Sequence, residues 1–402
     1  SYPTVATAIL SRFTDDLMDI DELAALCEDA YDYEVPLEHV VERRYVMRLD
    51  QGPTASFKDF AARAMGRLIG RLVKDDTEEL VILTATSGDT GSAVAQAFSG
   101  VPNTSVVVLF PFAEVSTRQR KQMTTIGGNV KTIAVDGKFD DCQAMVKRAF
   151  ADSQLNKIRL SSANSINIGR LLPQSVYYIY AYLQLADVAA GEQVVFSVPC
   201  GNFGNLVGGL LSFFAGLPVE KFVVATNAND EVPRFFQSEL YEKIDPSRVC
   251  LSNAMNVGHP SNLARLVTLY GGQMDEAGCL PQLPDMERLR RDLYAVSVDD
   301  EQTRQTIARA WQDHKLILEP HGAVGWMGLE RLAEAGQLGE QTLAISLETA
   351  HPAKFPDEVR ALTGIEPELP PSLAAIETMD EAYETMDVDY DVFCKMLRDW
   401  YE

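Results

Sequence analysis

Short runs rich in valine and isoleucine alternate with amphipathic stretches from about residue 54 onward, and this alternation constrains the fold more than any other feature. Runs that are apolar at nearly every position are typical of parallel strands buried on both faces. The amphipathic stretches between them have the length of crossover helices. We therefore predict an α/β protein with open, mostly parallel twisted sheets and helices on both faces.

The expected elements are spread along most of the chain. Strand candidates cover residues 81–86, 105–110, 130–135, 157–162, 194–199, 222–227 and 342–347. Helical patterns cover residues 92–98, 139–150 and 171–185. Residues 1–45 have a mostly acidic helical pattern, which includes Asp19 to Tyr31. Residues 356–402 form an acidic tail that ends in a helix from Asp391 to Tyr401.

The chain is strongly acidic. Its 402 residues contain 35 Lys+Arg and 58 Asp+Glu, which gives a formal net charge of −23. A field of that sign repels nucleic acid and anionic lipid, so it excludes binding that depends on a basic surface. A local basic pocket for a small anion is still compatible with this charge.

Three further absences bear on location and metal binding. No apolar run approaches the ~20 residues that a membrane-spanning helix needs. The N-terminus lacks the basic lead and the long apolar stretch of a secretory signal. The six cysteines are far apart and lack the spacing of a disulfide framework or a zinc site. We therefore expect a cytoplasmic protein without a metal ion.

Two glycine-rich segments directly follow strand candidates, which is where ligands bind in open α/β sheets. The first, TATSGDTGSA at 84–93, leads from a strand into a helix, and it is either an anion site at a helix N-terminus or an ordinary capped turn. The second, VPCGNFGNLVGG at 198–209, has glycines that allow close backbone approach and is a candidate phosphate-binding loop. It matches neither the dinucleotide fingerprint nor the P-loop.

A third segment, 49–73, contains a lysine in an unusual place. Lys58 falls in the first turn of a helix, where a cation opposes the helix dipole. That position is poor for a structural lysine but favours the neutral amine of a nucleophile. The alternative is a solvated surface lysine.

Two more polar segments follow strands. Asn164, Ser165 and Arg170 suit a phosphate or a carboxylate, or else form a helix cap with a surface arginine. Thr349, at the end of another strand, is a candidate hydrogen-bond partner for a ring nitrogen. The nearby His321 and His351 are interpreted as structural, since a lone histidine is more often structural than catalytic.

In this order along the chain, these segments resemble the threonine synthase family, which comprises pyridoxal-phosphate enzymes of the tryptophan-synthase β fold. The resemblance runs from about residue 25 to 365. It rests on GPTASFKDF, TATSGDTG, QMTTIGGNV, FDDCQ, NSINIGRLLPQ, CGNFGN, SNAMNVGHPSN, EPHGAVG and TAHPAKF.

The resemblance implies a fold type II enzyme with two lobes and a cofactor between them. Its expected parts are an N-terminal helical layer (1–45), a large cofactor-binding domain (46–80 and 160–355), a smaller substrate-side domain (81–159) and an acidic tail (356–402). It implies pyridoxal phosphate bound covalently to Lys58, with Asp89 near its ring hydroxyl and Thr349 at its ring nitrogen. The residues implied for its phosphate are Gly201, Asn202, Phe203, Gly204 and Asn205.

The implied reaction converts O-phospho-L-homoserine and water to L-threonine and phosphate. Lys58 would remove the Cα proton of the substrate and shuttle protons to the neighbouring carbons. The residues implied for the substrate are Ser87, Gly88, Thr90, Asn164, Ser165 and Arg170. We expect a small phosphorylated amino acid as the partner and a monomer or a homodimer as the assembly.

Three departures from the family pattern bear on the substrate. Gln51 replaces a common histidine, and Phe112 and Glu114 stand where a lysine and another basic residue are common. We interpret these positions as exposed and without a role. The rivals are a phospho-lyase or β-replacement enzyme acting on O-phosphoserine or O-phosphothreonine, and a cofactor-free homologue that acts in binding or regulation.

Overall fold

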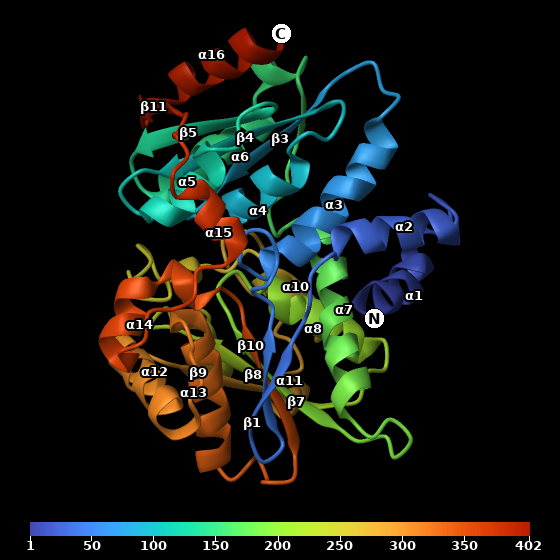
Figure 1. Ribbon diagram of the computed structural model, residues 1–402, viewed down its shortest axis with the longest axis vertical. Coiled ribbons are helices and arrows are strands. Elements are labelled where there is room, and N and C mark those ends of the chain that lie inside the picture. The colour runs from blue at the N-terminus through green and yellow to red at the C-terminus, as the bar shows by residue number, and fades with distance from the viewer. The chain divides into compact units, whose positions relative to one another are not determined.

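The strand candidates are divided between two sheets in the computed structural model, which describes all 402 residues (Figure 1). Each sheet is the centre of one compact unit. Unit 1 comprises Ser1–Asp16, Tyr33–Gln51 and Leu171–Glu368, and unit 2 comprises Leu17–Asp32, Gly52–Arg170 and Leu369–Glu402.

Unit 1 contains a six-stranded sheet in the order β1-β2-β10-β7-β8-β9. Only the β1–β2 pair is antiparallel, and the other pairs are parallel. The strands are β1 (Leu37–Val41), β2 (Arg44–Arg48), β7 (Val194–Pro199), β8 (Val219–Thr226), β9 (Leu293–Ser297) and β10 (Leu343–Glu348).

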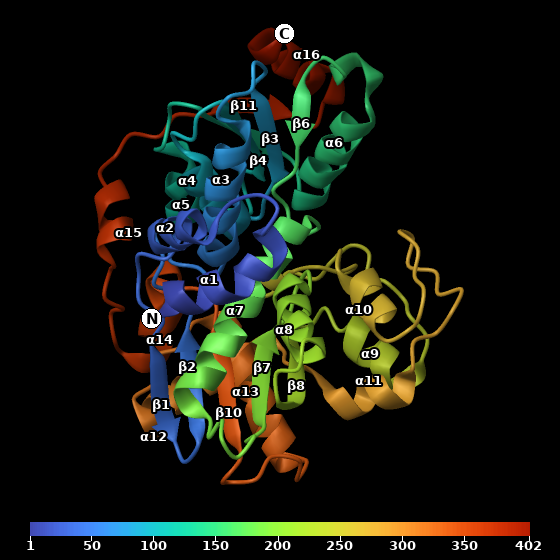
Figure 2. The same ribbon diagram turned by 90° about the vertical axis from the view of Figure 1, so that its right-hand side faces the viewer.

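Helices cover both faces of this sheet. Figure 1 shows α12 and α13 on one side of the strands and α7 on the other, and Figure 2 shows α9, α10 and α11 grouped beyond α8. The α13 side buries Trp326 and Leu329 against Val195 and Val223. The helices are α1 (Tyr2–Thr14), α7 (Ile168–Leu185), α8 (Gly204–Phe214), α9 (Glu231–Ser238), α10 (Leu263–Leu269), α11 (Met286–Asp292), α12 (Asp300–His314), α13 (Pro320–Glu334) and α14 (Pro356–Thr363), with the short 3₁₀ turns η2 (Asn253–Met255) and η3 (Pro352–Lys354).

Unit 2 contains a five-stranded, entirely parallel sheet in the order β11-β5-β4-β3-β6. Alternate residues of its central strands enter two separate cores: Ile82 and Val106 lie in one, and Val81 and Val107 lie in the other. The strands are β3 (Leu80–Ala85), β4 (Thr104–Pro111), β5 (Val130–Asp136), β6 (Arg159–Ser161) and β11 (Glu384–Asp387).

The helices of unit 2 form one layer on each of these cores. Helix α4 contributes Val94 and Phe98 to the first core, and α6 and α16 contribute Met145 and Phe393 to the second. The helices are α2 (Ile20–Ala30), α3 (Lys58–Val73), α4 (Asp89–Phe98), α5 (Thr117–Thr124), α6 (Phe139–Ala151), α15 (Pro371–Ile376) and α16 (Tyr390–Tyr401), with the 3₁₀ turn η1 (Ser153–Leu155).

The predicted fold class is confirmed, and all seven strand candidates correspond to strands. Four strands were not expected: β1, β2, β9 and β11. Each has only four or five residues and lacks a long apolar run. The helical interpretation of residues 1–45 is therefore wrong over β1 and the start of β2, which turn back on each other through Glu42 at φ 52°.

The division into units also differs from the expected boundaries. Residues 52–80 belong to unit 2, because α3 packs on α4. Residues 369–402 belong there as well, because β11 pairs with β5 and α16 enters the second core, as Figure 1 shows in red. The helical layer at the N-terminus is shared, with α1 in unit 1 and α2 in unit 2.

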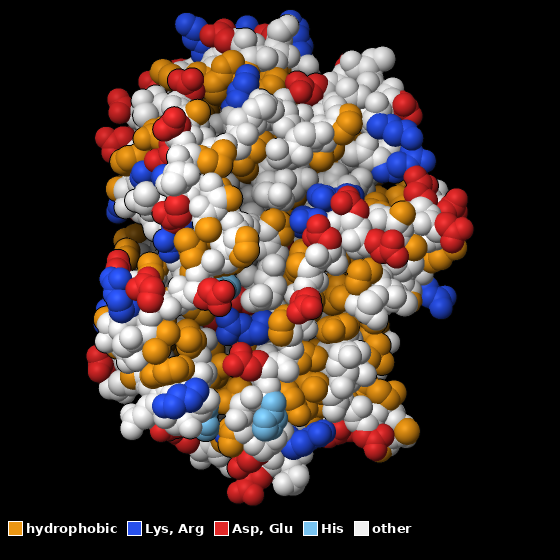
Figure 3. Space-filling model, viewed as in Figure 1, with side chains coloured by type: hydrophobic (Ala, Val, Ile, Leu, Met, Phe, Trp, Pro, Cys, Tyr) orange, Lys and Arg blue, Asp and Glu red, His pale blue; other side chains and the backbone are white.

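No helix is long and apolar enough to cross a membrane. On the face drawn in Figure 3, acidic and basic side chains are interspersed among apolar and other groups. The structure also contains no group of three or more His, Cys, Asp and Glu side chains that could hold a metal ion.

Candidate active site

Lys58 is the first residue of α3, and the loop before it is held by a buried carboxylate. Asp59 accepts hydrogen bonds from the backbone N–H of Thr54 at 2.8 Å and from its hydroxyl at 2.6 Å. A Cβ at Gly52 would lie 2.4 Å from Asp59 Oδ2, so this turn has room only for glycine. The loop formed by residues 52–57 therefore fixes the position of Lys58 at the start of α3.

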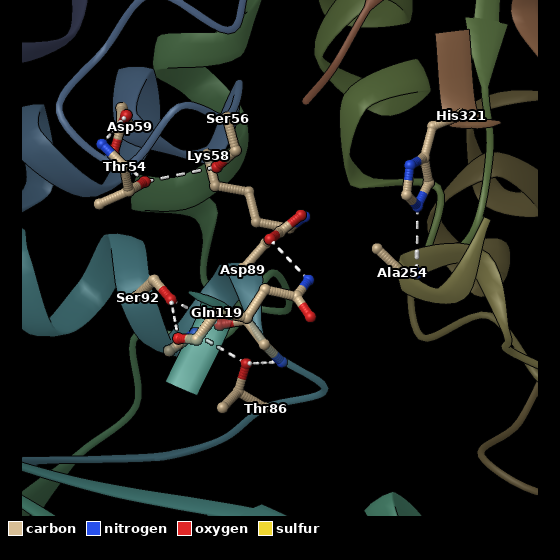
Figure 4. A network of polar contacts seen from close by, with 12 residues as sticks. Thr54, Ser56, Lys58, Asp59, Thr86, Asp89, Ser92, Gln119, Ala254 and His321 are labelled. Atoms are coloured by element: carbon tan, nitrogen blue, oxygen red, sulfur yellow. Dashed lines mark hydrogen bonds and ion pairs between the residues drawn. The ribbon is translucent and has the colours of Figure 1, made fainter. Parts of the chain in front are cut away.

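The lysine side chain lies against an acidic partner within unit 2. Lys58 Nζ is 3.5 Å from Asp89 Oδ2, and the lysine side chain is 14% exposed (Figure 4). Asp89 is buried, and its other oxygen accepts a hydrogen bond from Gln119 Nε2 at 3.1 Å. The interpretation of Lys58 as a solvated surface lysine is wrong. Gln119 was missed, because it lies within α5 and bonds to a residue 30 positions away in the sequence.

The turn between β3 and α4 is fixed by short side chains. Thr86 Oγ1 accepts the N–H groups of Gly88 at 2.9 Å and Gly91 at 2.8 Å, and Ser92 Oγ donates to the carbonyl of Gly88 at 3.0 Å. Gly88 has φ 131°, a backbone conformation that side chains rarely adopt. Ser87 and Thr90 are half-buried in this turn.

The segment after β6 lies at the same edge of the sheet, because β3 and β6 are neighbouring parallel strands. Thr84 of β3 donates a hydrogen bond to Asn164 Oδ1. Ser165 is half-buried, and Arg170 NH1 donates to the carbonyl of Ala163 at 2.5 Å. Unit 2 therefore brings both predicted substrate segments together.

Arg170 is buried, so the interpretation as a surface arginine is wrong. Burial lowers the pKa of its guanidinium to about 10, and the negative charge of Asp59 partly opposes that change. An arginine kept this far from water is a strong attractor for an anion, because little solvent screens its charge.

In unit 1, the glycine-rich loop leads from β7 into α8. Phe203 has φ 63°, and a Cβ at Gly201 would lie 2.9 Å from Met255 Cα. The first N–H groups of α8, which begins at Gly204, have no partner within the helix and therefore favour an anion.

Asn205 adds a buried donor to this loop. Its Oδ1 accepts hydrogen bonds from the hydroxyls of Tyr177 and Tyr178, both at 2.6 Å, while its Nδ2 is buried without a partner. A donor with no partner at a helix N-terminus fits a phosphate group.

Thr349 is buried directly after β10. Because β10 and β7 are neighbouring parallel strands, Thr349 and the 201–205 loop follow the same edge of the sheet. The preceding Glu348 is also buried, and its pKa is raised by burial and by the nearby Glu319. The neutral hydroxyl of Thr349 thus follows a buried carboxyl group whose ionisation is opposed by its surroundings.

The two histidines of this region have structural contacts, as expected. His351 Nδ1 accepts the N–H of Ala353 at 3.1 Å, and burial lowers the pKa of its ring. His321 bonds to Glu319 and to the backbone of Ala254. Neither partner of His321 was predicted: Ala254 is distant in the sequence, and Glu319, although close, has the pattern of an ordinary helix cap.

The three departures from the family pattern are exposed, as expected. Gln51 donates to Asp50 Oδ1 at 2.8 Å, and Glu114 accepts the N–H of Phe139 at 3.1 Å. The ring of Phe112 is 44% exposed and contacts the guanidinium of Arg120.

Comparisons with known proteins agree with this arrangement. A family model described as pyridoxal-phosphate dependent enzyme matches residues 35–348, and one described as threonine synthase, C-terminal, matches residues 322–395. Threonine synthase of Escherichia coli is 38% identical over 397 residues, which is 98% of this chain and 87% of that protein. Its crystal structure aligns with a TM-score of 0.87 over 100% of this chain and 88% of that chain.

A second solved structure is threonine synthase of Brucella melitensis with bound pyridoxal phosphate. It aligns with a TM-score of 0.90 and 32% identity, and the alignment covers 100% of this chain and 89% of that chain. Fold and family together define a fold type II enzyme that depends on pyridoxal phosphate. More particularly, relatives at this level of identity over nearly the full length show that the chain belongs to the threonine synthase family.

Proposed function

We propose that this enzyme converts O-phospho-L-homoserine and water to L-threonine and phosphate, with each predicted site residue in the role given below. The observation that carries the proposal is Lys58, which begins α3 with its amine 3.5 Å from the carboxylate of Asp89. A lysine at a helix start, with 14% of its side chain exposed, is poorly suited to a structural role and well suited to act as nucleophile and base.

Lys58, oriented by Asp89, is the residue proposed for proton transfer to and from the substrate carbons. When bound, pyridoxal phosphate supplies the electron sink that makes loss of the substrate Cα proton possible. Lys58 Nζ would hold the cofactor covalently in the resting enzyme, and its amine would take the Cα proton of the substrate and return protons to the neighbouring carbons. Asp89, whose Oδ1 accepts a hydrogen bond from Gln119, orients the amine and would also hold the ring hydroxyl of the cofactor.

The residues proposed for the cofactor in unit 1 bind its phosphate and its ring. Backbone N–H groups of Gly201 to Asn205 and the amide of Asn205 bind the phosphate, which the buried donor of Asn205 fits. The hydroxyl of Thr349 would hold the ring nitrogen. A hydroxyl in that place would leave the nitrogen largely uncharged, in contrast to a carboxylate.

The residues proposed for the substrate in unit 2 bind its anionic groups. Arg170 supplies the positive charge, and its bond to the carbonyl of Ala163 fixes the segment that presents Asn164 and Ser165. Ser87, Gly88 and Thr90 contribute hydroxyl and backbone donors from the turn that Thr86 holds. Each charge-assisted hydrogen bond is worth about 1.5–3 kcal/mol.

Product analysis tests the reaction. The purified enzyme is loaded with pyridoxal phosphate and incubated with O-phosphohomoserine, and threonine and phosphate are quantified. We expect equal amounts of both, and none from Lys58→Ala, which should also lose the visible absorbance of the bound cofactor. Lys74→Ala, at the C-terminal end of the same helix, is the matched control. Phosphate released from O-phosphoserine or O-phosphothreonine, without threonine from O-phosphohomoserine, would overturn the proposal.

We also infer a cytoplasmic enzyme that acts on a small molecule as a monomer or a homodimer. Cysteines without disulfide spacing support a reducing compartment. Light scattering after size exclusion tests the assembly, because the monomer has a mass of 44.4 kDa. A species larger than two chains would contradict the inference.

A further inference from the structure

His321 has the most completely defined polar surroundings among the residues without a proposed role. It is the second residue of α13 and is buried. Glu319, the residue that caps this helix, accepts the N–H groups of His321 and Gly322 at 2.9 Å each. Its Oε2 also accepts a hydrogen bond from Nδ1 of the His321 ring at 2.5 Å.

The other ring nitrogen of His321 accepts a hydrogen bond from the protein backbone. The N–H of Ala254 donates to His321 Nε2 at 3.1 Å (Figure 4). A backbone N–H can only donate, so Nε2 carries a lone pair and the ring hydrogen lies on Nδ1. The imidazole is therefore neutral, and Glu319 selects its tautomer.

Ala254 belongs to η2, the turn that packs on the start of the glycine-rich loop. A Cβ at Gly201 would lie 2.9 Å from Met255 Cα and 3.0 Å from the carbonyl oxygen of Ala254. The backbone of η2 and that of Gly201 are thus in direct contact. A displacement of Ala254 would therefore displace Gly201 directly, because no side chain lies between the two backbone segments.

The same segment holds the loop a second time, farther along the chain. The N–H and hydroxyl of Ser261 donate to Asn202 Oδ1 at 3.3 and 3.2 Å. The side-chain amide of Asn262 donates to the carbonyl of Asn202 at 3.0 Å. Residues 253–262 therefore contact Gly201 at one end and Asn202 at the other, and the hydrogen bond from this segment to His321 is at the Gly201 end.

We propose that His321 is a positioning residue for the phosphate-binding loop. Through its acceptor nitrogen it fixes η2, and η2 fixes Gly201, so that the backbone N–H groups of 201–205 are already arranged before an anion arrives. Such preorganisation increases affinity because less order has to be created on binding. The proposal rests on the proposed function only in assigning the cofactor phosphate to this loop.

Two substitutions separate the two nitrogens of the ring. His321→Asn keeps a donor near the Nδ1 position toward Glu319 and removes the acceptor for Ala254. His321→Gln places its amide oxygen near Nε2 and restores that acceptor. We expect the dissociation constant for pyridoxal phosphate to rise about tenfold in His321→Asn and to remain within about threefold of wild type in His321→Gln.

Amide hydrogen exchange of the cofactor-free protein gives a second readout. The Ala254 amide should exchange about tenfold faster in His321→Asn than in His321→Gln, while the Ser261 amide should exchange equally in both. Glu319→Ala covers the case in which His321→Asn does not fold. It keeps the ring but removes the acceptor of the Nδ1 hydrogen, so the ring is no longer held with Nε2 toward the Ala254 N–H and cofactor affinity should fall as in His321→Asn.

Equal cofactor affinity in the folded His321→Asn and His321→Gln variants would overturn the proposal, as would wild-type affinity in a folded Glu319→Ala variant. These measurements use no substrate. A wild-type enzyme that binds pyridoxal phosphate but makes no threonine would therefore overturn the proposed reaction alone. A wild-type protein that binds no pyridoxal phosphate would overturn both.

Discussion

At the scale of single residues, the lysine of this site depends on a glycine six positions before it. A Cβ at Gly52 would meet Asp59 Oδ2 at 2.4 Å and Asp59 Cβ at 2.8 Å. The carboxylate would have to move, and both of its hydrogen bonds from Thr54 would be strained. The position of Lys58 therefore depends on the lack of a Cβ atom at Gly52.

We expect Gly52→Ala to lower the free energy of unfolding by about 1–3 kcal/mol, because overpacking of a well-filled site costs that much. Urea denaturation measures it. Gly339→Ala is the matched control: that glycine is exposed, and its added Cβ would meet nothing closer than Thr342 Oγ1 at 3.3 Å. The control should change by no more than about 0.5 kcal/mol. Equal losses in the two variants would contradict the role of Gly52.

Some single residues were predictable and others were not, for a physical reason. Lys58, Asp89 and Asn205 lie in turns or at helix starts. Such features are specified by neighbouring residues, so the sequence predicts these three positions. Gln119 bonds to Asp89, which lies on a different helix, so no local pattern predicts this contact. Glu319 bonds to His321, two residues along the chain. Glu319 was missed although it is near in sequence, because an acidic residue before a helix is also an ordinary cap.

At the scale of elements, α9 begins with a buried acid. Glu231 is the first residue of that helix, and its Oε2 is buried without a hydrogen-bond partner. Burial, with a smaller effect from Asp230, raises the pKa of its carboxyl from 4.5 to about 7. The folded chain therefore holds a proton that the unfolded chain releases at lower pH.

This difference makes stability depend on pH with a definite sign. Between about pH 4.5 and 7 the folded state binds more protons at Glu231, so its contribution to stability is fully present below that range and is lost as pH rises through it. We expect Glu231→Gln, which cannot ionise, to gain roughly 2–3 kcal/mol relative to wild type between pH 4.5 and 8. Urea midpoints at several pH values measure it. Glu220→Gln, at an exposed position of β8, is the control, and its difference in unfolding free energy from wild type should be the same at every pH. A difference that is also independent of pH for Glu231→Gln would refute the prediction.

Helix α16 is an integral part of unit 2 and not a loose tail. Phe393 and Leu397 are fully buried in the core that α16 shares with α6 and the sheet. We expect Phe393→Ala to lower the free energy of unfolding by about 3–5 kcal/mol, since it removes a large buried side chain. Val392→Ala is the matched control, because that neighbour is 45% exposed. Differential scanning calorimetry compares the two, and similar melting temperatures would contradict the packing described.

Three of the four strands that were missed share a property. Strands β1, β9 and β11 lie at the edges of their sheets, where a strand needs only one backbone partner and few apolar side chains. Strand β11 has the sequence ETMD and is a strand because β5 offers a free edge. Central strands such as β4 are buried at every position, so their continuous apolar runs made them predictable from composition.

At the scale of the whole molecule, the net charge of −23 opposes a substrate and a cofactor that both carry phosphate. Attraction must therefore come from local groups, namely Lys58, the buried Arg170 and helix N-termini, and not from the overall field. Figure 3 shows charges of both signs interspersed on the face drawn.

We expect kcat/KM for O-phosphohomoserine to stay constant or to rise as ionic strength increases from about 0.05 to 0.5 M, because salt screens a repulsive field. Steady-state kinetics in a non-binding salt tests this expectation. A steep fall in kcat/KM would show that long-range attraction guides the substrate after all.

The sequence by itself determined the parallel α/β fold, the family and the local segments that carry the proposed chemistry. It could do so because buried strands, glycine turns and helix starts are specified by neighbouring residues. Only the tertiary structure decided that Arg170 is buried, that Asp89 is held by Gln119, that β11 joins a sheet formed some 250 residues earlier, and that His321 supports Gly201 through Ala254. These features come from contacts between distant segments, whose partners are chosen by packing and strand order and leave no local pattern.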